Sequence, residues 1–349
     1  MKHILVCLSL LLSLNTTAFA MDVQDIKPHT PSKAPWSEQW FYYFSEPEVG
    51  YYKISFQTYI QGNSPNMKEA AYIHVAFAPI DGPPKFYDYF FDEVQLVTNE
   101  DPDSESFQFI VPDVMYADEH QVSINLPEFE FSMQWTGAHK RYWQRFFNPG
   151  EGPFGSISSL PFMDNRWFIY SMGTPTEYQF SNGQVSHQGK GVVSIDKGWY
   201  TTVNAQSFIY LFAADENMQL MFTGAQPQGI PIELWAGRYI SENLDLTFYP
   251  AIKGLSISHE ANACEGTFHL EIRKLFYRIE IDAKAPMDSF YISTMPTVDL
   301  LGATDPVMKS MTATMKLKVY KFGQLIEEKE IPQSFLEFGD KEYCTSLPH

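Results

Sequence analysis

The sequence has little cysteine and little positive charge. Of 349 residues only 3 are cysteine, and 24 Lys and Arg face 42 Asp and Glu, for a formal net charge of −18. We therefore expect no nucleic-acid partner, because phosphate binding requires a basic face. The acidity by itself indicates little more than solubility through charge repulsion.

Long hydrophobic runs are missing beyond the N-terminus. Met1-Lys2-His3 is a short basic start, residues 4–14 are an apolar run, and Ala18-Phe19-Ala20 is an A-x-A cleavage pattern. This pattern predicts a secretory signal peptide over residues 1–20 and an exported protein, periplasmic or secreted. No later stretch reaches the roughly 18 apolar residues of a membrane helix, so we expect no transmembrane segment.

The scarcity of cysteine limits the possible pairings. Cys7 leaves with the signal peptide, and Cys264 and Cys344 remain. Two cysteines in an exported protein usually pair, so we predict a Cys264–Cys344 disulfide, with two buried thiols as the alternative.

Signatures of several catalytic and cofactor sites are also absent. The glycine-rich segment 147–161 follows no strand-to-helix turn, as a phosphate loop would require, and its serines lack the G-x-S-x-G elbow of hydrolases. The histidines show no spacing typical of paired zinc ligands. We expect no cofactor and no metal site.

Aromatic residues are abundant. Phe, Trp and Tyr make up 16% of the chain, with 28 Phe and 20 Tyr. Short strand-like runs recur, such as 51–60, which alternates and predicts a strand with one buried face. Sustained helical periodicity is absent, so the sequence predicts an all-β protein.

The strand rhythm restarts near residue 204, which predicts two modules. We place the N-terminal module at residues 37–204 and the C-terminal module at 205–349. Residues 21–36 contain three prolines and no periodicity, and they predict an extended leader.

The stretch 186–200 concentrates chemistry-bearing residues. Val192, Val193 and Ile195 predict a strand from residue 190 to Asp196, ending at a glycine and two large aromatics. Asp196 and Lys197 therefore lie beside two aromatic rings within five residues. This stretch is the first candidate for acid–base chemistry.

Three segments carry a resemblance to a known family. Residues 38–42 (EQWFY), 71–77 (AYIHVAF) and 189–199 (GKGVVSIDKGW) resemble motifs of the hydroxyneurosporene synthase (carotenoid 1,2-hydratase) and tocopherol-cyclase-like superfamily. The resemblance implies a calycin fold with two lipocalin-like β-barrels in tandem. It also implies a hydrophobic, isoprenoid-like substrate.

The chemistry of that family suggests roles for particular residues. Protonating an alkene requires a carboxyl group kept protonated by burial, with aromatic faces near the resulting cation. Asp196 is the candidate acid and His74 a candidate proton relay. In the alternative interpretation Asp196 pairs with Lys197 on a barrel rim and His74 is a hydrogen-bonded core residue. The candidate ligand-binding residues are Trp40, Tyr42, Trp199 and Tyr200.

Three functional hypotheses follow. The first is an exported two-barrel protein that binds a hydrophobic small molecule or lipid, isoprenoid or acyl, in a barrel-sized pocket. The second makes the same pocket catalytic, as a hydratase, cyclase or isomerase with Asp196 as acid. The third is a secreted interaction module whose aromatic residues only fill its core. The sequence does not identify the ligand or the oligomeric state.

Overall fold

The computed structural model describes residues 23–62, 67–80, 82–135, 137–142, 152–153, 165–201, 205–227, 231–293, 307–340 and 344. The expected signal peptide, residues 1–20, lies outside these residues. Within them the elements are strands and two short 3-10 helices, which confirms the all-β class. No helix in the described part is long and apolar enough to cross a bilayer.

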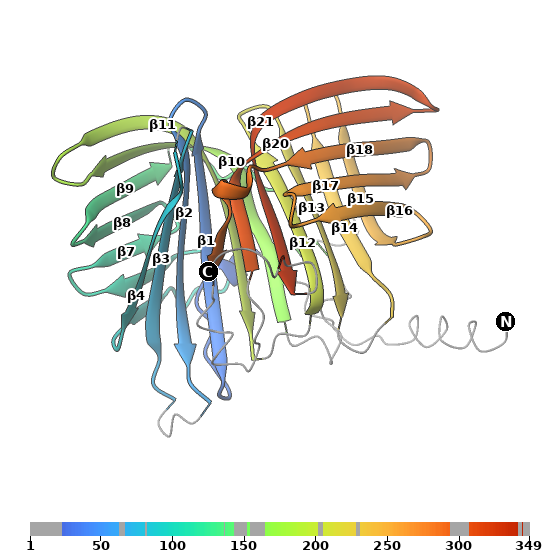
Figure 1. The fold of residues 1–349 in the computed structure, drawn as a ribbon. Helices are drawn as coiled ribbons and strands as arrows, with labels where there is room; N and C mark the ends of the chain where they lie inside the picture. Colours follow the sequence, from blue (N-terminus) through green and yellow to red (C-terminus); the bar gives the residue numbers. More distant parts are fainter. Residues whose placement is uncertain are drawn as a thin grey trace, which may run out of the picture.

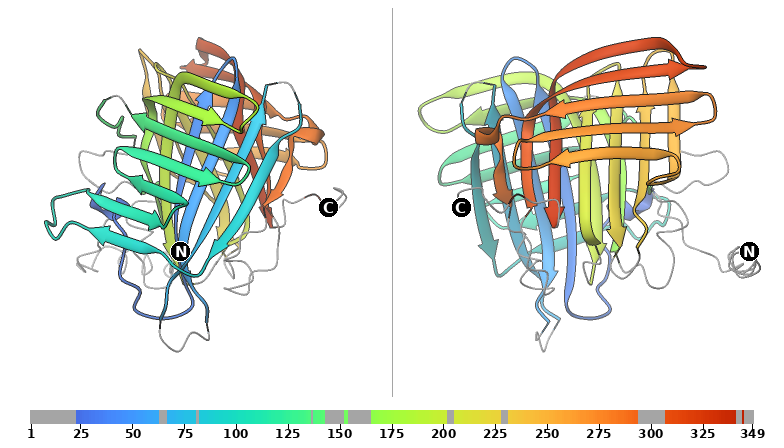
Figure 2. Two further views of the ribbon diagram at one scale, coloured as in Figure 1. Left: turned by 90° about the vertical axis from the view of Figure 1, so that its left-hand side faces the viewer. Right: turned by 45° about the vertical axis from the view of Figure 1, so that its right-hand side comes forward.

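The strands form two large antiparallel sheets that pack against each other (Figure 1). The first has eleven strands in the order β4-β3-β2-β1-β11-β10-β9-β8-β7-β6-β5, and it curls around its own core (Figure 2). Its strands are β1 (Trp36–Glu46), β2 (Gly50–Ile60), β3 (Ala70–Pro79), β4 (Lys85–Phe91), β5 (Gln95–Thr98), β6 (Phe107–Val111), β7 (Met115–Asp118), β8 (Gln121–Leu126), β9 (Phe129–Trp135), β10 (Asn165–Ser181) and β11 (Ser186–Tyr200).

The second sheet is built from the strands that follow residue 204. Its path is β15-β14-β13-β12-β21-β20-β18-β17-β16, and β19 also pairs with β20. Its strands are β12 (Ala205–Ala214), β13 (Gln219–Pro227), β14 (Leu234–Ile240), β15 (Asp245–Ile252), β16 (Ile257–Asn262), β17 (Thr267–Lys274), β18 (Tyr277–Lys284), β19 (Tyr291–Ser293), β20 (Val307–Lys321) and β21 (Gln324–Asp340), and the 3-10 helix η3 (Met287–Ser289) precedes β19.

Burial patterns explain where each strand lies. β8 and β9 alternate buried with less buried residues, as expected for strands with one face on a core and one in water. Every residue of β2 is buried, so the prediction of one buried face for residues 51–60 is wrong. The second sheet covers the face that the sequence pattern assigned to solvent.

Three apolar clusters hold the molecule together. One lies inside the first sheet and one inside the second. The third lies between the sheets and is rich in aromatic rings, including Tyr43 and Tyr51 of the first sheet and Phe212 and Phe335 of the second. Tyr43 meets the Phe212 ring edge-on at 4.6 Å between centroids, so aromatic packing joins the two sheets.

Strand β11 is longer than predicted. It continues past Asp196 to Tyr200, because its pairing with β1 continues to the Ser37–Tyr200 pair. Asp196 is therefore a mid-strand residue, opposite Phe41 of β1. This correction matters for the site, because side chains in the middle of a paired strand alternate strictly between the two faces.

A buried ion pair attaches the N-terminal segment to the first sheet. Lys197 Nζ lies 2.6 Å from Glu38 Oε1, and both side chains are fully buried. Lys197 also donates to the carbonyl oxygen of Asp25 at 2.5 Å, next to the 3-10 helix η1 (Val23–Ile26). His29 Nδ1 lies 2.6 Å from the same Glu38 oxygen. Part of the expected leader is thus bound to the sheet by polar contacts.

The structure contains the predicted disulfide. Cys264 and Cys344 are bonded, with their Cα atoms 5.0 Å apart and a sequence separation of 80. Closing a loop of this length stabilises the fold by about 4 kcal/mol in the chain-entropy description. The bond ties the C-terminal segment to the turn between β16 and β17, and it fits an oxidising compartment.

Lys197→Met is expected to lower the free energy of unfolding by about 3–5 kcal/mol, because it leaves a charged Glu38 buried without its lysine. Urea unfolding at neutral pH measures the change. Lys190→Met is the matched control, since Lys190 on the same strand pairs with Glu177 in solvent, and it should change stability little. Equal effects of the two variants would contradict a stabilising role for the buried pair.

Candidate active site between the two sheets

The six candidate site residues divide between the two faces of the first sheet. Neighbouring side chains on a strand point to opposite faces, so a set drawn from consecutive positions is split. Three join the aromatic core inside the curled sheet, and three face the second sheet. The first group is Trp40, Tyr42 and Trp199, and the second is Asp196, His74 and Tyr200.

The inner group packs against other aromatic rings. Trp40 stacks on Phe56 with centroids 5.5 Å apart and donates its indole N–H to the Ile26 carbonyl at 2.7 Å. Tyr42 also stacks on Phe56, at 5.3 Å. Trp199 stacks on His29 at 4.2 Å. Ligand binding by these three residues stays a prediction, and their observed contacts are those of a packed core.

Asp196 is a buried carboxyl group whose hydrogen-bond donors are neutral. Its side chain is 3% exposed. Tyr210 of β12 donates to Oδ2 at 3.1 Å, while Oδ1 has no hydrogen-bond partner among the described residues. Burial raises the pKa of Asp196 to about 8, against the opposing effects of the Tyr210 hydrogen bond, the Lys53 charge and the Trp167 indole. At neutral pH this group is protonated and can donate a proton.

Lys197 does not pair with Asp196, contrary to the alternative interpretation. The two residues are adjacent in β11, so their side chains leave opposite faces of the sheet. Lys197 binds Glu38 on the inner face. Lys197 is therefore on the opposite side of the sheet from Asp196 and does not offset the effect of burial on the Asp196 pKa.

Aromatic rings surround Asp196 on the face between the sheets. Tyr210 lies 5.2 Å from the Phe212 ring and 5.8 Å from the Phe335 ring, between centroids. Trp167 meets Tyr210 edge-on at 5.3 Å. Burial raises the pKa of Tyr210 well above its usual value, so the phenol stays neutral and donates a hydrogen bond to Asp196.

Two lysines and a glutamate lie in the same interface. Lys53 of β2 and Lys309 of β20 are each 1% exposed. Lys309 Nζ lies 3.4 Å from Glu337 Oε1 of β21. Burial and the neighbouring Lys309 charge lower the pKa of Lys53 well below its usual value. The Lys53 amine and the Asp196 carboxyl of the first sheet therefore share the interface with the Lys309–Glu337 pair of the second sheet.

His74 forms a second polar group in the interface, as a dyad with Asp88 of β4. Its Nδ1 lies 2.8 Å from Asp88 Oδ1, and Tyr72 donates to the same oxygen. Burial lowers the pKa of His74 to about 4, so the imidazole is neutral at neutral pH. Because Asp88 accepts at Nδ1, the proton is assigned to Nδ1 and Nε2 is a free acceptor, without a partner among the described residues.

Asp196 and His74 lie in one cross-strand row. The register runs from Asp196 to Phe41, from Phe41 to Ser55 and from Ser55 to His74. Three strand spacings separate the acid from the imidazole, about 14 Å at about 4.8 Å each. They cannot exchange a proton directly, but both can reach one elongated molecule lying across the sheet.

The sequence interpretation missed five polar residues of this interface. Lys53 is a lysine in a strand that is otherwise rich in aromatic residues, which is a signal that could have been noticed. The alternation of polar and apolar residues in that strand assigned Lys53 to the solvent face instead. The other residues depend on pairing between strands far apart in sequence, which no local pattern contains. These five are Lys53, Asp88, Tyr210, Lys309 and Glu337.

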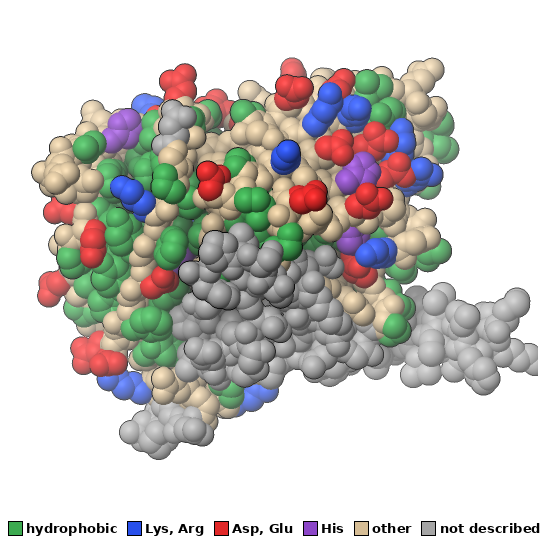
Figure 3. Space-filling model, in the orientation of Figure 1, with side chains coloured by type: hydrophobic (Ala, Val, Ile, Leu, Met, Phe, Trp, Pro, Cys, Tyr) green, Lys and Arg blue, Asp and Glu red, His purple; other side chains and the backbone are tan. Residues whose placement is uncertain are grey.

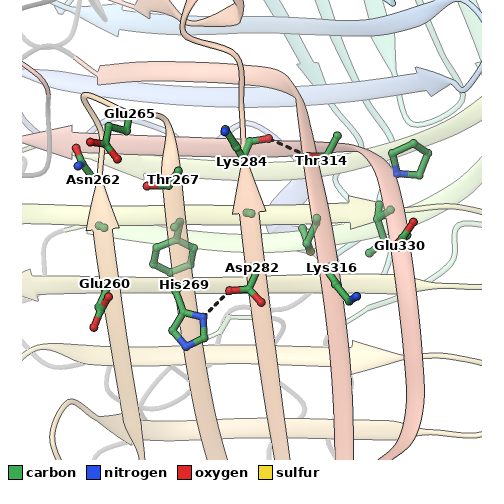
Figure 4. Close-up of a pocket in the computed structure, with 16 residues that line it drawn as sticks. Glu260, Asn262, Glu265, Thr267, His269, Asp282, Lys284, Thr314, Lys316 and Glu330 are labelled. Carbon is green, nitrogen blue, oxygen red and sulfur yellow. Dashed lines mark hydrogen bonds and ion pairs between the residues drawn. The ribbon is translucent and has the colours of Figure 1, made fainter.

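The large concavities of the described surface lie elsewhere. One of about 860 Å³ lies on the second sheet, where a cross-strand row carries charged side chains (Figure 4). There His269 and Asp282 point toward each other, with Nδ1 and Oδ1 2.7 Å apart. Two others, of about 660 and 670 Å³, lie along the first sheet. None of the three is lined by Asp196 or His74, and we give more weight to the convergence of buried polar groups than to open surface volume.

Metal chemistry has no obvious site in the described part of the chain. No group of three His, Cys, Asp or Glu side chains there is arranged to hold an ion. The interface groups are suited to proton transfer by side chains alone: a neutral carboxyl, a neutral imidazole, tyrosine hydroxyls and lysines.

The raised pKa of Asp196 predicts a pH-dependent stability difference between the wild type and Asp196→Asn. Below about pH 3 the aspartate is protonated in both folded and unfolded states. As pH rises toward 8, only the unfolded state loses the proton, so the wild type loses stability relative to the asparagine variant. Linkage gives a difference of about 3–5 kcal/mol at pH 7. Chemical unfolding of both proteins from pH 4 to 8 measures it, and a constant difference would contradict the burial argument. Asp282→Asn, on the exposed row, serves as control.

Comparison with known proteins gives structural relatives only. No family model matches the chain, and no curated protein has a matching sequence. The fold is similar to that of CghA, solved with Sch210972 (TM-score 0.60, 9% identity, 94% of this chain and 96% of that chain). It is also similar to kievitone hydratase from Nectria haematococca (TM-score 0.54, 10% identity, 93% and 94%). An AttH-like protein from Nitrosomonas europaea is a third relative (TM-score 0.51, 12% identity, 90% and 95%). The chain thus shares, over nearly its whole length, the two-part β fold of these three proteins.

Proposed function

We propose that this protein binds a hydrophobic small molecule between its two sheets and protonates it with Asp196. The observation that carries the proposal is the state of this carboxyl group: buried, protonated at neutral pH, and with one oxygen free. An isolated buried carboxyl weakens the fold, so its presence on an aromatic interface favours a chemical role.

The proposed reaction is acid-initiated addition to a carbon–carbon double bond. The Asp196 hydroxyl gives its proton to one alkene carbon, the π electrons form the new C–H bond, and the other carbon becomes cationic. The rings of Tyr210, Phe212 and Phe335 offer π faces to that cation. Capture by water, with loss of a proton, gives a hydrated product; capture by a second double bond gives a ring; loss of a proton gives an isomer.

His74 has a separate role in this proposal. Its free Nε2 is an acceptor about 14 Å along the sheet from Asp196, near Tyr291, whose ring lies 5.9 Å from the imidazole between centroids. At that distance it orients a polar end of the substrate by accepting a hydrogen bond. It therefore acts as a positioning group and does not relay the proton of Asp196.

The structural relatives support the choice of substrate class. One is named a hydratase, and another was solved with a small organic molecule, Sch210972. The motif resemblance to the carotenoid hydratase and tocopherol-cyclase-like superfamily adds an isoprenoid to the candidates. The same proposal takes the chain as exported, with lipocalin-like modules at residues 37–204 and 205–349.

A binding protein without chemistry is the second candidate. The interface rings pack closely, with Phe212 and Phe335 stacked at 5.0 Å between centroids. Tight packing of this kind suits an interaction module whose interface is filled by its own side chains, whereas a carrier would hold its ligand between the same rings without chemistry. The proton donor distinguishes the enzyme from both.

The test begins with the molecule that the protein carries. Native mass spectrometry of the protein from its own host, followed by organic extraction, is expected to identify a bound hydrophobic compound. A protein that stays ligand-free after exposure to a lipid extract of that host would favour the interaction module.

Asp196→Asn is then expected to keep the ligand and lose turnover by about 10²–10⁴-fold, because amides do not donate protons as acids do. Wild-type activity should fall as pH rises through the Asp196 pKa of about 8. Product formation from the extracted compound is followed by chromatography across pH 5–10. Asp282→Asn, far from the interface, should behave as the wild type. Unchanged turnover in Asp196→Asn would remove this residue as the acid.

A further inference from the structure

Three turns of the second sheet lie side by side at one edge of the molecule (Figure 1). They join β15 to β16, β17 to β18 and β20 to β21. The Phe322 N–H donates to the Phe276 carbonyl at 2.9 Å, and the Arg273 N–H to the Ser256 carbonyl at 2.8 Å. We call residues 253–256, 273–277 and 321–326 the tip cluster.

The tip cluster exposes large apolar side chains. Leu275 is 88% exposed, Leu255 82% and Phe322 68%, the three highest values among the large hydrophobic residues described. The rings of Phe276 and Phe322 lie 4.5 Å apart between centroids, so the exposed groups form a continuous patch. Hydrophobic side chains are visible along this edge in Figure 3. Contiguous apolar surface of this kind marks an interaction site.

The backbone shows that these side chains do not serve the fold. Leu275 has φ of +53° and Phe322 of +52°, in the left-handed region at the first position of a two-residue turn. Glycine, asparagine and aspartate adopt this conformation easily, whereas bulky residues are strained there. The turns would form more readily with small or polar residues, so the exposed leucine and phenylalanine need another explanation.

The charged residues within the three segments of the tip cluster are all basic. Its sequence segments, KGLS, RKLFY and KFGQLI, contain four basic residues and no Asp or Glu, in a chain of net charge −18. Lys253 and Arg273 pair with Glu233 and Glu271, which lie outside the cluster. Lys321 lies over the Tyr277 ring at 5.4 Å. Apolar tips flanked by Lys, Arg and Tyr are the combination that suits the surface of a bilayer.

We propose that the tip cluster docks this protein on a lipid membrane surface that carries anionic headgroups. The leucine and phenylalanine side chains enter the boundary between headgroups and acyl chains, as the apolar face of an interfacial helix does. Lys274 and Lys321 stay at headgroup level, where the negative surface potential attracts them, whereas the charges of Lys253 and Arg273 are matched by Glu233 and Glu271. Such docking is peripheral and reversible. The inference does not depend on the reaction proposed above, because it concerns turns at the ends of strands in the second sheet and not its interface with the first sheet.

Co-sedimentation of the mature chain with vesicles tests the proposal. We expect binding to vesicles of phosphatidylcholine with about one-third phosphatidylglycerol, and much weaker binding to phosphatidylcholine alone, with loss at high salt. The double variant Leu275→Asn/Phe322→Asn should reduce the bound fraction at least tenfold. Its unfolding temperature should stay the same or rise, because asparagine fits the left-handed turn, so loss of binding cannot be ascribed to unfolding.

Two further variants complete the design. Val185→Asn is the matched control, since Val185 is 58% exposed beside the β10–β11 turn of the other sheet, and it should bind as the wild type. Lys274→Gln/Lys321→Gln should weaken binding to anionic vesicles and leave the weak binding to neutral ones. Absence of binding, or equal binding by the asparagine double variant, would overturn the proposal. A dimer of the free protein that this double variant dissociates, without vesicle binding, would replace it with self-association.

Discussion

The molecule depends on strands that are buried on both faces. β1 and β2 contribute one set of rings to the core of the first sheet and the other set to the interface with the second. This double burial is why the central strands carry aromatic residues at consecutive positions, as in Trp40 to Phe44. It also fixes the register, since a shift of one residue would exchange the two faces of a strand and place each side chain in the wrong core.

The same constraint makes the interface costly for polar groups. Water does not reach a carboxyl or an amine between two aromatic layers, so each must find a partner or become neutral. The pKa values follow this rule: that of Asp196 rises to about 8, that of His74 falls to about 4, and that of Lys53 falls well below its usual value. A core selected for stability alone would not gather these groups on one face, and their presence there is the main argument for chemistry.

The sequence was sufficient for the fold class and the disulfide, and only partly for the site. Strand periodicity is local, so alternation in residues 51–60 correctly predicted a strand, and two cysteines left one pairing. Predicting the site would have required knowing which face of each strand a side chain points to. The stretch around Asp196 was predicted to be the centre of the site, and this stays a prediction. Trp199 and Asp196 lie on opposite faces of β11, and other buried polar residues of the interface, such as Lys309, come from the other half of the chain. A single sequence shows the alternation of side chains along a strand but not which sheet covers each face. Residues that the alternation assigned to solvent are therefore buried under the second sheet.

Glu38 and Asp196 show how a sheet can bury two carboxyl groups with opposite outcomes. They lie on neighbouring strands, both almost completely buried, but on opposite faces. Burial alone would raise the pKa of Glu38 too, yet Lys197 and His29 outweigh it and keep that carboxylate ionised. Asp196 accepts a hydrogen bond from the neutral hydroxyl of Tyr210 and keeps its proton. A carboxylate whose charge is matched by neighbouring cations has no proton to donate to a ligand. A protonated carboxyl with an unbonded oxygen can donate one. The difference in partners, and not the difference in burial, therefore separates the structural residue from the candidate acid.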